Sequence, residues 1–158
     1  MPLPRPSRLP RTLAALARHY AADPAAWPVP PQFDPTDRWY TRIARAADHE
    51  AWLLTWLPGQ ATDLHDHGGS AGALHVVSGE LTEHTLRRAP GSALTSRRYR
   101  AGSTRPFGAH HLHRVENTGV VPAISLHVYA PALASMTRYR IDGGRLLVAE
   151  VARAGANW

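Results

Sequence analysis

Short apolar runs that end at turn residues fill the chain after Trp39, and they constrain its fold more than any other feature. Examples are Ala51–Leu57, Ala73–Ser78, Leu81–Leu86 and Ala123–Tyr129, which end at Pro58-Gly59, Gly79, Ala89-Pro90-Gly91 and Pro131. Runs of this length and spacing predict an all-β sandwich or barrel. Parallel βαβ units would need long amphipathic helices between the strands, and the sequence has no such segments there. We therefore expect an all-β fold.

The first 35 residues have a different pattern. Thr12 is the predicted N-cap of a short helix, and four residues are spaced to form one apolar face of it: Leu13, Leu16, Ala17 and Tyr20. Five prolines between Pro24 and Pro35 predict an extended connector after the helix. We therefore divide the chain into residues 1–35, a tail with a short helix and a Pro-rich connector, and a single domain over residues 36–158.

The amino-acid composition excludes several classes of site. The chain has 158 residues and no cysteine, so disulfides, thiolate ligands, iron–sulfur clusters and a cysteine nucleophile are excluded. A bound metal would therefore need nitrogen or oxygen ligands, and ten histidines are available.

The charge pattern indicates neither nucleic acid nor membrane as a partner. The net charge is +6, but the arginines are scattered except at Arg97, Arg98 and Arg100, and the aromatic residues are not regularly interleaved with the arginines as base stacking would require. We interpret this cluster as a solvated face. No apolar run approaches the ~20 residues that span a bilayer. The N-terminal segment MPLPRPSRLPR lacks the apolar stretch of a secretory signal, so a cytoplasmic protein is expected.

The strongest motif is Gly59-x5-His65-Asp66-His67-x11-Gly79. Two histidines at i and i+2 of a strand point to the same face, so both rings could contact one ion. A third histidine ligand would come from the segment 106–117, where His111 and His113 share a strand face and His110 points away. The spacing does not choose between His111 and His113.

Two carboxylates near this motif are further candidates. The better-known non-haem iron site has two histidines and one carboxylate, so Asp63 and Asp66 stay possible ligands. Asp66 faces away from His65 and His67, and it could instead orient a ligand imidazole.

At these residues the chain resembles the thiol dioxygenases of the cupin superfamily, bacterial cysteine dioxygenase in particular. The cupin signature is complete except for its glutamate, which is replaced by Gly72, and thiol dioxygenases characteristically lack this carboxylate. The resemblance extends from about Tyr40 to Tyr129 through four segments in order: Tyr40-Thr41-Arg42, residues 59–79, His113-Arg114-Val115-Glu116-Asn117 and Ser125-Leu126-His127-Val128-Tyr129. The residues before position 40 and those after Tyr139 carry no motif that matches the family.

The resemblance implies a cupin (small jelly-roll) β-barrel and a role for each of several residues. The iron ligands would be His65, His67 and His113. A hydrogen-bonded relay would consist of Ser125, His127 and Tyr129, and their i, i+2, i+4 spacing independently places them on one strand face. Arg42 would bind the substrate carboxylate, Tyr40 would lie in the same pocket, and Trp56 would form a wall of the pocket or support it from outside. Gly72 replaces the cysteine that crosslinks to tyrosine in animal members, so that crosslink cannot form.

The resemblance also implies a reaction. The protein would be an Fe(2+)-dependent enzyme that adds both atoms of O2 to the sulfur of a small carboxylate thiol, with L-cysteine as the first candidate. Other candidates are 3-mercaptopropionate, mercaptosuccinate and a thiol-imidazole, and a non-oxygenase metal-binding cupin is the alternative class. The expected partners are a small-molecule thiol and O2, in a monomer or small homo-oligomer.

Overall fold

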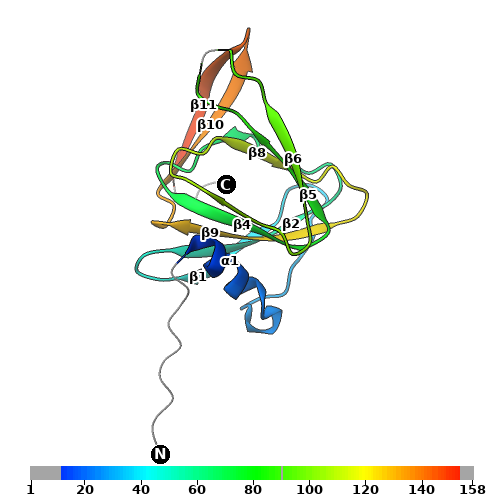
Figure 1. Cartoon of the computed structure of the whole chain (residues 1–158). Coiled ribbons are helices and arrows are strands. Elements are labelled where there is room, and N and C mark those ends of the chain that lie inside the picture. The colour runs from blue at the N-terminus through cyan, green and yellow to red at the C-terminus, as the bar shows by residue number, and fades with distance from the viewer. Residues whose placement is uncertain (1–11, 90, 154–158) are drawn as a thin grey trace, which may run out of the picture.

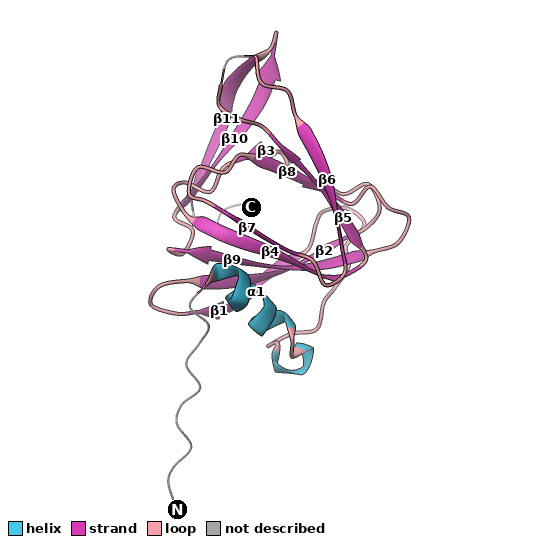
Figure 2. Ribbon diagram, viewed as in Figure 1, coloured by secondary structure: helices cyan, strands magenta, loops and turns pink. Residues whose placement is uncertain are grey.

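The computed structural model describes residues 12–89 and 91–153. Two antiparallel sheets that face each other make up most of this range (Figures 1 and 2). The five-stranded sheet has the order β1 (Tyr40–Arg45), β2 (Glu50–Trp56), β9 (Ala123–Ala130), β4 (Ala71–Ser78), β7 (Thr104–Phe107). The six-stranded sheet has the order β11 (Arg145–Arg153), β10 (Ser135–Asp142), β3 (Leu64–His65), β8 (His113–Glu116), β5 (Glu80–Thr85), β6 (Thr95–Arg100). The predicted all-β class is confirmed, and the four predicted strands correspond to β2, β4, β5 and β9.

The central core lies between the two sheets, and strand alternation explains how it forms. On β9, Tyr129 belongs to the core cluster between the sheets, while Leu126 and Val128 belong to a second cluster on the outer face. Successive side chains of a strand point to opposite faces, so Ser125 and His127 share the inner face with Tyr129. The polar relay residues are therefore buried inside the molecule.

The N-terminal helix α1 (Leu13–Ala21) covers the outer face of the five-stranded sheet (Figure 1). Its predicted N-cap is confirmed, because the Thr12 hydroxyl accepts a hydrogen bond from the backbone N–H of Ala15 at 3.1 Å. Leu16 and Ala17 pack against the outward side chains of β4 and β9. No helix in the described part of the chain is long and apolar enough to cross a membrane.

The Pro-rich connector is mostly without regular structure, as predicted, except at its beginning. A single 3-10 turn, η1 (Pro24–Ala26), starts there with its proline at the first helical positions. Proline is tolerated at a helix start because its missing N–H would have no partner in that turn. The extended prediction was therefore wrong for these three residues.

The predicted solvated basic cluster lies on the edge strand β6. Arg97, Arg98 and Arg100 are exposed, and Glu80 on the neighbouring strand lies 3.7 Å from Arg98 and 3.4 Å from Arg100. The cluster is thus partly neutralised by a carboxylate of the next strand.

Candidate metal centre and substrate pocket

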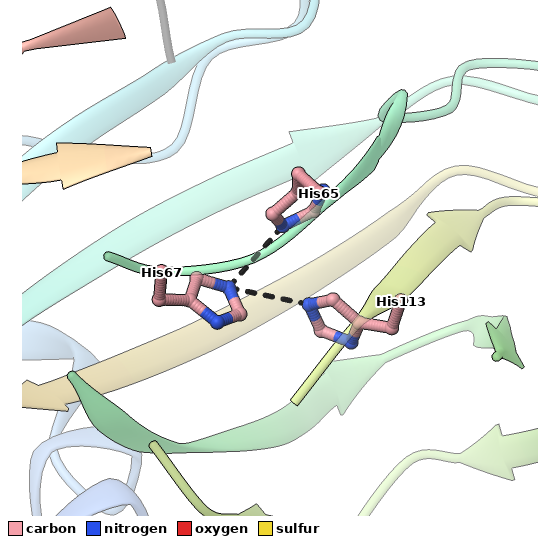
Figure 3. A group of neighbouring side chains, drawn as sticks. All are labelled: His65, His67 and His113. Carbon is pink, nitrogen blue, oxygen red and sulfur yellow. Dashed lines mark hydrogen bonds between the residues drawn. The ribbon is translucent and has the colours of Figure 1, made fainter. Parts of the chain in front are cut away.

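Three buried histidines converge between the two sheets. His65 ends β3, His67 follows two residues later, and His113 begins β8 directly opposite His65 in the sheet register. The Nε2 atom of His67 lies 3.2 Å from that of His65 and 3.3 Å from that of His113 (Figure 3). Sequence reasoning left the third ligand open between His111 and His113, and His113 is the one that joins the other two.

The local backbone differs from the single strand that the motif predicted. The strand β3 ends at His65, so His67 lies in the loop that follows it. The backbone turns there through Gly68 and Gly69, which have φ values of 58° and 94°. Such positive values suit glycine because it has no Cβ. The same-face prediction for the two rings nevertheless agrees with their close Nε2 contact.

Hydrogen bonds at the Nδ1 atoms of His65 and His113 fix which nitrogen of each ring carries the proton. The Nδ1 atom of His65 donates to the Asp63 carbonyl oxygen at 2.7 Å, and Nδ1 of His113 donates to Oε1 of Glu83 at 2.8 Å. Both oxygens can only accept, so in a neutral ring the proton stays on Nδ1 and Nε2 presents a lone pair. Burial lowers the pKa of all three histidines, which keeps the rings neutral.

This arrangement of nitrogens fits a divalent transition-metal ion. The Nε2 atom of His67 can carry at most one proton, but it lies close to the Nε2 atoms of both His65 and His113, which present lone pairs. At least one of these two contacts therefore brings two nitrogen lone pairs together. The Nδ1 atom of His67 is buried and has no hydrogen-bond partner among the described residues. An ion bound at about 2.0–2.1 Å from each nitrogen would separate the ligand nitrogens by roughly 3.0–3.4 Å, in agreement with the observed spacing. Three neutral imidazoles suit iron, zinc, copper or nickel.

The two candidate carboxylates, Asp63 and Asp66, do not belong to the group formed by the three histidines. Asp66 accepts hydrogen bonds from the Tyr139 hydroxyl at 2.6 Å, from Arg88 at 2.7 Å and from the backbone of Gly68. The suggestion that Asp66 could orient a ligand imidazole by a direct hydrogen bond is therefore wrong, because none of these hydrogen bonds comes from a histidine ring. The carboxylate of Asp63 is 73% exposed, and its contribution near His65 is the backbone carbonyl.

Gly72 leaves no room for a carboxylate at the position of the missing cupin glutamate. A Cβ at this position would lie 2.6 Å from ring atoms of Phe107 and 2.7 Å from the Val128 carbonyl oxygen. The Phe107 ring stacks on His67, with ring centroids 5.0 Å apart. An aromatic side chain therefore occupies the space beside the metal ligands.

The sequence did not point to Glu83, whose carboxylate accepts a hydrogen bond from Nδ1 of His113. Its buried carboxylate accepts hydrogen bonds from His113 at 2.8 Å, from His111 at 2.6 Å and from Arg105 at 3.0 Å. Burial opposes its ionisation, but the bonds from His111 and His113 outweigh burial and hold the pKa of Glu83 well below its ordinary value. His111 therefore binds Glu83, and their direct hydrogen bonds leave no space between them for a second ion.

The predicted relay residues are connected by hydrogen bonds. The Trp56 indole N–H donates to Oγ of Ser125 at 2.9 Å, that Oγ lies 2.8 Å from Nε2 of His127, and Nδ1 of His127 lies 3.3 Å from the Tyr129 hydroxyl. Burial lowers the pKa of His127 to about 3, and burial raises the pKa of Tyr129 above its ordinary value. The imidazole is therefore neutral and the phenol protonated at physiological pH.

A pocket of about 130 Å³ adjoins both the histidine trio and the relay. This volume is near that of a cavity that binds benzene, so it suits a ligand of a few heavy atoms. Of the predicted site residues, His65, His113, His127, Tyr129 and Tyr40 line it. Arg42 does not line it, whereas two other arginines do, Arg38 and Arg138.

Comparison with known families agrees with this geometry. The family model of cysteine dioxygenase type I matches residues 11–141, which is most of the chain. The chain belongs to the cysteine dioxygenase type I family. The match begins before helix α1 and extends into β10, so this cysteine dioxygenase family member resembles its family over more of its length than the four motif segments cover.

Solved structures share the fold of this cysteine dioxygenase family member. The protein TT1209 from Thermus thermophilus is 25% identical, with a TM-score of 0.54 over 65% of this chain and 90% of that one. A Klebsiella pneumoniae protein with a double-stranded β-helix domain is 20% identical, with a TM-score of 0.53 over 74% and 88%. Oxalate oxidase in complex with glycolate is 22% identical, with a TM-score of 0.53 over 61% and 52%. The predicted cupin barrel is thereby confirmed.

Proposed function

We propose that this protein is an iron(II)-dependent thiol dioxygenase and that His65, His67 and His113 hold the iron. The observation that supports this most directly is the trio of Nε2 atoms with no carboxylate among them, beside a buried tyrosine, in a member of the cysteine dioxygenase type I family. A hydrolytic or isomerising metal site would not explain the hydrogen-bonded relay that ends at Tyr129.

The proposed reaction converts a thiol, RSH, and O2 into a sulfinic acid, RSO2H. Both oxygen atoms form bonds to sulfur, and the thiol supplies all the electrons, so no further reductant is needed. A sulfinic acid is the second oxidised state of cysteine sulfur. When bound, iron(II) would supply the redox chemistry that couples O2 to the sulfur.

The relay would hold the Tyr129 hydroxyl in a fixed orientation. Trp56 donates to Ser125, so the serine proton is free to point to Nε2 of His127. The neutral imidazole then carries its proton on Nδ1 and donates to the tyrosine oxygen. In this arrangement the Trp56, Ser125 and His127 protons each have an acceptor, and the phenol proton of Tyr129 can point into the pocket. There it could donate to oxygen or sulfur of the reactants.

The pocket supports a small carboxylate thiol as the substrate class. Its volume of about 130 Å³ excludes peptides, and arginines in its wall suit a carboxylate. L-cysteine, 3-mercaptopropionate and mercaptosuccinate are the substrates to compare. The carboxylate role of Arg42 and the cytoplasm as the place of action stay predictions.

Oxygen uptake by the iron-loaded protein tests this function. We expect oxygen consumption with at least one of the three thiols, and a product heavier than the thiol by two oxygen atoms in mass spectrometry. Mercaptosuccinate and 3-mercaptopropionate differ from L-cysteine in charge and amine, so their relative rates identify the substrate. If iron binds and none of the thiols is oxidised, the proposal is wrong.

Replacing Tyr129 by Phe separates the relay from metal binding. We expect turnover to fall by about 10²–10⁴-fold, the range for loss of a positioned proton donor, while the iron content stays at the wild-type level. Iron content and oxygen uptake are measured on the same preparation. Loss of iron in this variant would contradict the assignment of Tyr129 to the reaction.

A further inference from the structure

His67 differs from the other two candidate ligands in what holds its ring. His65 and His113 each donate a hydrogen bond from Nδ1 to a protein oxygen, whereas Nδ1 of His67 is buried without a hydrogen-bond partner among residues 12–89 and 91–153. Histidines that bind metals usually have such a partner, and it fixes the orientation of the ring. His67 also lies in the loop after β3, whereas the other two belong to strands (Figure 3). Its position therefore depends on how this loop is held.

Asp66, the residue between the two histidines of the motif, fastens the loop to β10. Its backbone N–H donates to the Thr137 carbonyl oxygen at 3.0 Å. Its Oδ2 atom accepts a hydrogen bond from the Tyr139 hydroxyl at 2.6 Å, and its Oδ1 atom accepts one from the backbone N–H of Gly68 at 3.1 Å. The bond to Gly68 closes a turn of the kind that aspartate side chains form with the backbone two residues on. The residues on both sides of His67 are thus tied together by one side chain.

Arg88 joins the same carboxylate and the same tyrosine. Its Nη2 atom donates to Oδ2 of Asp66 at 2.7 Å, and its Nη1 atom donates to the Tyr139 oxygen at 3.1 Å. Its guanidinium carbon lies 5.1 Å from the centroid of the Tyr139 ring. Each of these three side chains therefore contacts the other two, and we call them the Asp66 network. The Arg88 side chain is 41% exposed, so solvent screens its ion pair and the short bond from Tyr139 is the stronger contact.

Gly68 brings the loop close to the beginning of β10. A Cβ at Gly68 would lie 2.5 Å from the Ser135 carbonyl oxygen, so the backbone can approach the strand this closely only without a side chain. The φ value of 58° at Gly68 also favours glycine. Together with the contacts of Asp66, the loop meets every second residue of β10 from Ser135 to Tyr139.

We propose that the Asp66 network holds His67 within reach of the metal ion. It acts through the backbone of the loop, because none of its hydrogen bonds goes to the ring. Asp66, Arg88 and Tyr139 are then positioning residues for one ligand of the three. The inference rests on the proposed function, since it concerns His67 as an iron ligand.

Metal binding without thiol or O2 tests this role. Metal-free protein is titrated with Co(II), its affinity is measured by competition with a chelator, and the visible absorption of the bound ion reports its ligand number and symmetry. We expect Asp66→Ala to weaken Co(II) binding by about 10- to 100-fold, the usual effect of losing the support of a metal ligand. The spectrum should shift toward that of His67→Ala. Tyr139→Phe, which removes one hydroxyl, should weaken binding by roughly 3- to 10-fold.

A double variant and a matched control separate positioning from general destabilisation. If Tyr139 acts through Asp66, Tyr139→Phe should cause little further loss of affinity when it is added to Asp66→Ala. Tyr20→Phe is the control, because it also removes a tyrosine hydroxyl, one that lies 2.8 Å from Nε2 of His49 beside helix α1. We expect this control to keep the wild-type affinity and spectrum.

Three results would overturn the proposal. They are a wild-type affinity and spectrum in Asp66→Ala, a loss in Tyr139→Phe no larger than in Tyr20→Phe, and a loss from Tyr139→Phe that is undiminished in the Asp66→Ala background. A wild-type protein that binds no Co(II) would overturn this inference together with the proposed ligands. A protein that binds metal but oxidises no thiol would contradict the proposed reaction alone, because the Co(II) experiment contains neither reactant.

Discussion

At the scale of single residues, Glu83 shows how the candidate metal ligands are kept in position. It accepts hydrogen bonds from His113, His111 and Arg105, and with a metal bound it would complete a carboxylate–histidine–metal arrangement. Such a partner fixes both the orientation of the ligand ring and the nitrogen that carries the proton. The lone pair of His113 therefore depends on a residue outside the histidine trio.

Replacing Glu83 by Gln should weaken metal binding by about 10- to 100-fold, because the neutral amide is a poorer acceptor for the His113 proton. Affinity is measured by competition with a chelator of known strength. Glu80→Gln is the matched control, since Glu80 lies on the same strand but faces Arg98 and Arg100 at the surface. Equal metal affinities for the two variants would contradict the role of Glu83.

The grouping of the three histidines could be predicted from the sequence, and the position of Glu83 could not. His65 and His67 lie two residues apart, and the resemblance selects His113, so short patterns were sufficient. Glu83 meets His113 only because β5 pairs with β8, across 30 residues of chain. The signal that could have found it is a glutamate on the same strand face as the buried Leu81.

At the scale of elements, the close approach of β4 and β7 shapes the wall behind the metal. Gly72 pairs with Phe107 on one side and with Tyr129 on the other. The space that a side chain would need at Gly72 is filled by the ring of Phe107. The missing Cβ of Gly72 thus lets the Phe107 ring lie over β4, beside the candidate ligand His67.

Replacing Gly72 by Ala should destabilise the protein by about 1–3 kcal/mol, the usual cost of inserting a methyl group into a filled core. The free energy of unfolding is measured with urea. Gly108→Ala is the control, because a Cβ there would have no atom within 4 Å. A Gly72→Ala protein as stable as the Gly108→Ala protein would mean that Phe107 moves aside freely.

Strands with several buried side chains could be predicted, and short or mostly exposed strands could not. β2, β4, β5 and β9 have six to eight residues each with several buried side chains, so their pattern is visible in the sequence. β3 has two residues, and it is a strand only because β8 and β10 flank it. β6 reads Thr-Ser-Arg-Arg-Tyr-Arg and buries Tyr99 alone. Strand pairing, and not local pattern, forms these elements.

At the scale of the whole molecule, four buried histidines couple stability to pH. Burial lowers the pKa of His65, His67, His113 and His127 in the folded protein. In the unfolded chain these residues take up protons below pH ~6.5, so acid favours unfolding. Each contributes up to about 1.4 kcal/mol per pH unit.

The metal-free protein should therefore lose stability as the pH falls from 7 to 5.5, measured by urea unfolding at several pH values. His127→Gln should have a shallower slope than the wild type, because its histidine pKa of about 3 in the folded state no longer contributes. His110→Gln, at an exposed position, should keep the full slope. A stability that is constant or rises over this range would be inconsistent with neutral buried rings.

The two sheets contribute different residues to the candidate site. The three candidate ligands come from β3, the loop after it and β8 of one sheet, while His127 and Tyr129 belong to β9 of the other. Helix α1 packs directly behind β9, on the face opposite to these side chains. A substitution beneath the helix would therefore act first on β9, and it would reach the candidate ligands only through ring contacts such as that of Tyr129 with His67, whose centroids lie 5.1 Å apart. The outer helix is thus linked to the histidine trio through the side chains that fill the space between the two sheets.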